Sequence, residues 1–92
     1  MTNTTTTRNF RCYDKSGSAV SLEADSAQAA ARTFARLFVD ANQTVEIYVE
    51  DFATCKNEDD APETLKFRAL TAGSELNDNM CDVSIVESCY QI

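Results

Sequence analysis

Hydrophobic and polar residues alternate along five short stretches of the chain, with the period of two that a β-strand requires. The stretches are residues 8–14, 19–24, 44–52, 64–71 and 80–92. The first two are separated by the turn-forming residues 15–18, so together they predict a β-hairpin. In the last stretch, Tyr90 and Ile92 have the opposite parity to Cys81, Val83 and Ile85, which predicts a bend near residues 87–88.

Between the second and third stretches, the apolar residues recur at helical spacing. Asp25 is expected to cap this helix, with Gln28 as its capping-box partner. Asn42 is expected to leave it in a left-handed conformation. The apolar stripe runs over about four turns and contains Ala27, Ala30, Ala31, Phe34, Leu37, Phe38 and Ala41. Its alanines allow close approach to a sheet, and its two phenylalanines are expected to fill the far end.

The predicted fold is α+β, with the element order ββαβββ and a single, mainly antiparallel sheet that has one amphipathic helix packed on one face. The chain of 92 residues suits one domain, residues 1–92, in which residues 1–7 are expected to be flexible. The connections 53–63 and 72–79 are polar and are expected to be exposed. The face under the helix is expected to collect Phe10, Val20, Leu22, Val45, Ile47, Leu65, Phe67, Val83 and Ile85.

Charge and cysteine content indicate the kind of partner and the cellular compartment. Fifteen acidic residues against eight Lys and Arg give a net charge of −7, which opposes non-specific binding to nucleic acid and suits a partner with a basic surface. The N-terminus lacks the pattern of a signal peptide, and no apolar run approaches the ~20 residues that span a bilayer. We therefore expect a cytoplasmic protein. In that reducing compartment Cys12, Cys55, Cys81 and Cys89 are expected to be free thiols, some of them buried.

Histidine and the common catalytic motifs are missing from the sequence. The chain contains no histidine, which removes the commonest general base and metal ligand. There is no C-x-x-C pair for zinc, and neither glycine lies in a phosphate-binding pattern. The acidic run at residues 58–60 has the residue types to bind a metal or to act as acid and base, but a run of this kind in a loop is more often solvated charge. We therefore predict no enzyme, no catalytic residue, no metal and no cofactor, and expect a protein that binds another macromolecule.

One candidate for contacting that partner lies on the predicted helix. Arg32 and Arg36 are one turn apart, opposite the apolar stripe, and like charges at this spacing repel each other unless a residue such as Asp40 compensates them. They form either a solvated helix face or a basic spot that holds a phosphate or an acidic surface.

A second candidate lies on the open face of the sheet, where Arg11, Tyr13, Tyr48, Lys66 and Arg68 are expected to point. Aromatic and arginine side chains are enriched in interfaces. The alternative is cross-strand pairing of Glu46 or Glu50 with Lys66 or Arg68. The partner-binding residues that we predict from both candidates are Arg32, Arg36, Tyr48, Lys66 and Arg68.

An acidic set is the third candidate. As a cluster it would compete for a basic nucleic-acid groove, and otherwise it is ordinary solubilising charge. Its members are Glu46, Glu50, Asp51, Glu58, Asp59, Asp60 and Glu63.

The stretch from Val20 to Phe34 resembles a strand and alanine-rich helix unit that is common in small phage and mobile-element proteins. Over its full length the chain resembles anti-CRISPR proteins that inhibit the type I-F (Csy) surveillance complex, in size, acidity, single-sheet architecture and lack of a catalytic set. Such proteins share no signature motif, so no site residue is transferred from them.

The resemblance implies a non-enzymatic phage inhibitor in the cytoplasm of the host bacterium. Such an inhibitor would bind the Cas proteins along the guide RNA and block pairing with target DNA. Arg32 and Arg36 are then the expected contacts to the guide. The alternative is a phage or bacterial accessory protein that neutralises another host factor, such as a nuclease or a toxin.

Overall fold

Five strands and one helix make up the part of the chain that the computed structural model describes, residues 7–52 and 61–92. They are β1 (Arg8–Tyr13), β2 (Ala19–Ala24), α1 (Ala27–Phe38), β3 (Thr44–Asp51), β4 (Glu63–Leu76) and β5 (Asp82–Gln91). The strands form one antiparallel sheet in the order β2-β1-β3-β4-β5. The predicted α+β class and ββαβββ order are confirmed.

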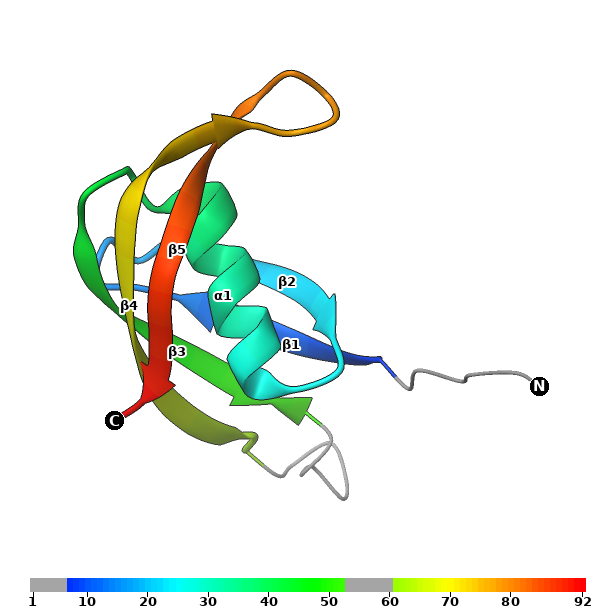
Figure 1. Cartoon of the computed structure of the whole chain (residues 1–92). Helices are drawn as coiled ribbons and strands as arrows, with labels where there is room; N and C mark the ends of the chain where they lie inside the picture. Colours follow the sequence, from blue (N-terminus) through cyan, green and yellow to red (C-terminus); the bar gives the residue numbers. More distant parts are fainter. Residues whose placement is uncertain (1–6, 53–60) are drawn as a thin grey trace.

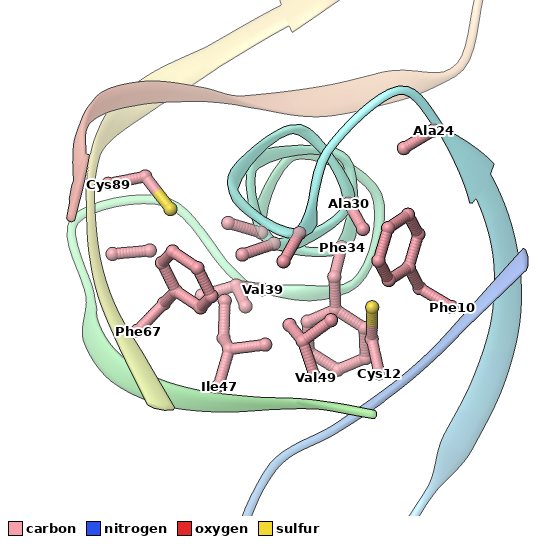
Figure 2. Packing of buried hydrophobic residues seen from close by; sticks show 14 residues of the cluster. Phe10, Cys12, Ala24, Ala30, Phe34, Val39, Ile47, Val49, Phe67 and Cys89 are labelled. Carbon is pink, nitrogen blue, oxygen red and sulfur yellow. The ribbon is translucent and has the colours of Figure 1, made fainter. Parts of the chain in front are cut away.

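The sheet curves around α1, which covers its concave face and leaves the convex face open (Figure 1). Alternation along the strands directs one set of side chains inward, and Phe10, Cys12, Ile47 and Val49 are fully buried. They meet the alanine-rich side of the helix and Phe34, as Figure 2 shows. Because alanine side chains are small, the helix lies close to the sheet, as predicted.

The helix begins one residue later than Asp25 would place it. The hydroxyl of Ser26 accepts a hydrogen bond from the backbone N–H of Ala29 at 3.1 Å, so Ser26 is the N-cap. Both residues favour this position. The prediction of Asp25 as the cap was wrong by one residue because sequence preference alone does not separate the two.

The helix also ends earlier than the apolar stripe predicts. It stops at Phe38, and the hydroxyls of Ser84 and Thr71 donate to the carbonyl oxygens of Val39 and Asp40. These bonds satisfy carbonyls that a longer helix would have used. Asn42 has the predicted left-handed conformation, with φ of 61°, but it lies in the turn beyond the helix.

Two apolar residues predicted to be buried at this end of the helix are exposed instead. Leu37 is 46% exposed and Phe38 is 52% exposed, and the Phe38 ring lies at the margin of the core, 5.4 Å from the Phe34 ring. The expectation that both phenylalanines fill the core is thus correct only for Phe34.

The hairpin of β4 and β5 is longer than predicted. Residues 72–76, expected to be a connection, continue β4 beyond a bulge between Leu70 and Gly73. On β5 the register skips Glu87, which is the predicted bend. This shift in parity packs Val86 and Cys89 against the core and leaves Ile85 43% exposed, so the expected burial of Ile85 was wrong.

Some expectations concern residues outside the described part of the chain. These are residues 1–6 of the segment predicted to be flexible, residues 53–60 of the first connection with their acidic run, and Cys55. Among the described residues, no helix is long and apolar enough to cross a membrane.

Candidate functional site

The five predicted partner-binding residues lie on two different faces of the molecule. Tyr48, Lys66 and Arg68 project from β3 and β4 on the convex face, where the strands carry them at matched register positions. Arg32 and Arg36 lie on α1, on the other side of the sheet. The structure therefore presents two separate candidate surfaces rather than one.

On the convex face, the tyrosine rings contact each other and a lysine of the same face. Tyr13 and Tyr48 lie opposite each other on β1 and β3, and their rings stack with centres 5.3 Å apart. The ammonium group of Lys66, on β4, lies 5.5 Å from the centre of the Tyr48 ring. A cation over an aromatic face is held by the negative potential of the ring.

The arginines of this face pair with glutamates across the strands. Arg11 Nη1 lies 3.7 Å from Glu50 Oε1, and Arg68 Nη2 lies 3.5 Å from Glu46 Oε1. Tyr90, and after it Glu46, raise the pKa of the Arg68 guanidinium further above its usual value. Exposed pairs add little stability, yet they neutralise the cations locally. Cross-strand pairing, the alternative considered for this face, is what the structure contains.

The acidic set does not form a free cluster within residues 7–52 and 61–92. Glu46 and Glu50 belong to the pairs on the convex face, and buried Asp51 accepts a hydrogen bond from Arg8 at 3.2 Å. These carboxylates are already engaged inside the molecule, which favours their interpretation as structural and solubilising charge.

Arg32 and Arg36 line an open groove of about 450 Å³ between α1 and the first half of β5. The helix forms one wall of this arginine groove, and the long hairpin forms the other. Its remaining lining residues are Ala29, Thr33, Glu75, Ser84, Ile85 and Val86. The groove therefore combines two cations with an apolar strand surface.

The two arginines differ in how they are compensated. Arg36 Nη2 lies 3.7 Å from Glu75 Oε1, and both side chains are about half exposed. Asp40 was expected in this role, but it follows the end of the helix. Arg32 has no ion pair with any residue that the structure describes, whereas Arg8, Arg11, Arg36 and Arg68 each have one.

The guanidinium of Arg32, beside an open groove, is suited to bind an anionic group of a partner. A guanidinium presents parallel N–H donors that match phosphate and carboxylate oxygens. The weak, solvent-exposed contact of Arg36 with Glu75 costs little to break. The sequence identified both arginines, but it missed Glu75 because residues 72–76 were expected to be a connection. It also missed Ile85 as a groove residue because this side chain was expected to be buried.

The two buried thiols, Cys12 and Cys89, offer little reactive chemistry. Burial raises the pKa of Cys12 to about 11. It also raises the pKa of Cys89, an effect that the charge of Arg32 opposes. A thiol is nucleophilic only as a thiolate, and a raised pKa disfavours the thiolate. Both cysteines are instead part of the hydrophobic core. Within the described residues, no group of three His, Cys, Asp or Glu side chains is placed to hold a metal ion.

No family model, curated protein or solved structure matches this chain. The interpretation of the site therefore depends on its own geometry and charge.

Proposed function

We propose that this protein is a non-enzymatic phage anti-CRISPR inhibitor, which binds the type I-F surveillance complex in the bacterial cytoplasm and blocks target DNA binding. One observation carries the proposal: an otherwise acidic molecule places Arg32, which has no ion pair among the described residues, and Arg36 beside it, along an open groove. A protein of net charge −7 needs local cations to approach an RNA phosphate.

The two signs of charge have separate roles in this proposal. The channel that holds a guide RNA in RNA-guided complexes is positively charged. The net negative charge of the inhibitor draws it toward that channel, since complementary fields accelerate association. At contact distance, Arg32 and Arg36 pair with phosphates of the guide. The bound protein then occupies the space that target DNA needs.

Two further observations support binding rather than catalysis. The chain has no histidine to act as a general base. The buried thiols of Cys12 and Cys89 have raised pKa values and remain protonated at neutral pH. Inhibition by occupying a surface requires neither group.

The first prediction concerns this groove. Replacing both residues, Arg32→Ala with Arg36→Ala, is expected to weaken binding to the purified type I-F complex about a hundredfold or more, because each of the two charge-assisted contacts contributes about 1.5–3 kcal/mol. Co-migration on a sizing column, followed by titration, measures the change. The matched control is Arg11→Ala with Arg68→Ala, which removes the same charge from the paired convex face.

Equal binding by the groove variant and the wild-type chain would remove the two arginines from the proposal. Absence of co-migration by the wild-type chain would remove the anti-CRISPR function for this complex. The alternative, neutralisation of a host nuclease or toxin, is then tested by pull-down from host lysate, with the same two variants as bait.

A further inference from the structure

The tip of the β4–β5 hairpin, residues 76–81, carries apolar side chains into solvent. Figure 1 shows β4 and β5 continuing past the end of α1, so that the turn between them projects from the body of the molecule. Leu76 is 60% exposed and Met80 is 75% exposed. Exposed apolar residues are common on this molecule, but these two lie on a turn that projects from its body, where a partner can reach them (Figure 1).

Hydrogen bonds fix the conformation of the tip. Asn77 organises the turn: its side-chain oxygen accepts hydrogen bonds from the backbone N–H groups of Asn79 and Cys81, at 3.0 and 2.9 Å. Its backbone N–H donates to the Cys81 carbonyl at 3.0 Å, and its carbonyl accepts from the Met80 N–H at 2.9 Å. Both polar groups of its backbone and its side-chain oxygen are used to fix this single turn.

The backbone conformation of Met80 is unfavourable for a methionine. Its φ is 63°, in the left-handed region that glycine and asparagine adopt more readily. At the other non-glycine residue with positive φ in the described chain, Asn42, the sequence has the residue expected there. An apolar side chain in a conformation of this kind, held by its surroundings, points to function at that position.

The charges around the tip indicate what kind of partner surface is complementary to it. Glu75, Asp78 and Asp82 flank Leu76 and Met80, and all three are exposed. The nearest cation is Arg36, which pairs with Glu75. Carboxylates at this density repel a phosphate backbone, so the complement is a protein surface in which an apolar pocket is surrounded by Lys and Arg.

We propose that the Met80 tip is an anchor that inserts into an apolar, basic-rimmed pocket on a protein partner. Methionine suits this use because its unbranched side chain adapts to irregular apolar cavities. The tip adjoins the arginine groove, since Arg36 and Glu75 border both. One partner can therefore present an anion to the groove and a pocket to the tip. The proposal rests on the proposed function, with a Cas subunit beside the guide RNA as the partner.

The test uses a substitution that removes the anchor and favours the turn. Asparagine tolerates a positive φ, so Met80→Asn is expected to fold with an unchanged or higher melting temperature. Truncating an interface anchor removes its buried apolar contacts, so binding to the purified type I-F complex is expected to weaken about thirtyfold. The matched control, Ile92→Asn, removes an apolar side chain of similar exposure (54%) at the opposite end of β5, and it is expected to bind normally.

A second measurement does not depend on any variant. Cys81 is exposed in the tip, whereas Cys12 and Cys89 are buried. Maleimide labelling, read by peptide mass spectrometry, is therefore expected to modify Cys81 in the free protein and to be slowed several-fold in the complex.

If wild-type protein binds but Met80→Asn binds equally well, or Cys81 remains as reactive in the complex as in the free protein, the anchor is overturned and the proposed function stands. If wild-type protein does not bind, both proposals are overturned for this complex.

Discussion

At the scale of single residues, burial decides what the cysteines do. Cys12 lies on β1, its side chain faces α1 and has no exposed surface (Figure 2), and desolvation raises its thiol pKa from 9.0 to about 11. Cys89 is buried and shifted in the same direction. Among the described residues, Cys12, Cys81 and Cys89 are free thiols. The interpretation of buried cysteines as small apolar residues agrees with this environment.

The raised pKa of Cys12 predicts a loss of stability in mild alkali. Since the folded-state pKa lies above that of the unfolded chain, the stabilisation is fully present below pH 9 and is lost as pH rises toward 11. A shift of this size corresponds to roughly 2–3 kcal/mol of unfolding free energy. Urea unfolding of wild type and Cys12→Ala across this interval measures it. The variant is expected to be less stable at pH 8 and to approach wild type near pH 11. A constant difference between the two proteins would contradict this assignment.

At the scale of elements, the N-terminus of α1 provides a direct comparison of two adjacent residues. Ser26→Ala removes the hydroxyl that accepts from the Ala29 N–H, and it is expected to cost about 1 kcal/mol of unfolding free energy. Asp25→Ala is expected to cost clearly less, because Asp25 lies before the cap. Thermal or urea unfolding of the two variants checks this order. A larger cost at Asp25 would contradict Ser26 as the cap.

The elements themselves were largely predictable from the sequence, because alternation is a local signal. Phe10 and Cys12 point inward together, as do Ile47 and Val49, and each pair follows from the period of its own strand. The ends of elements depend on distant residues. The helix stops where hydroxyls from β4 and β5 donate to the carbonyls of Val39 and Asp40, just beyond its end, and no pattern within the helix contains that information.

Of the candidate site, the part that depends on local spacing was predictable from the sequence, and the part that depends on strand pairing was not. Arg32 and Arg36 share a helix face, which the spacing of one turn predicts. Glu75 reaches Arg36 only because β4 continues past a bulge, and the exposed Met80 tip exists only because the hairpin is long. A bulge shifts the strand register through pairing with a neighbouring strand, so residues 72–76 had the appearance of a polar loop.

At the scale of the whole molecule, charge and geometry divide the surface into two parts. The convex face sets its cations against glutamates and an aromatic ring, and is internally compensated. The helix side carries an arginine groove and, next to it, an apolar tip among carboxylates. We therefore propose that the helix side and the hairpin bind the partner, and that the convex face contributes solubilising charge.

The central claim is that the protein occupies a surface needed by target DNA, and the order of addition tests it most directly. Purified type I-F surveillance complex is mixed with this protein either before or after labelled target DNA, and DNA binding is read by gel shift. We expect the shifted band to disappear when the wild-type protein is added first, and to remain when the Arg32→Ala, Arg36→Ala variant is added first. A full shifted band after prior addition of the wild-type protein would contradict the claim.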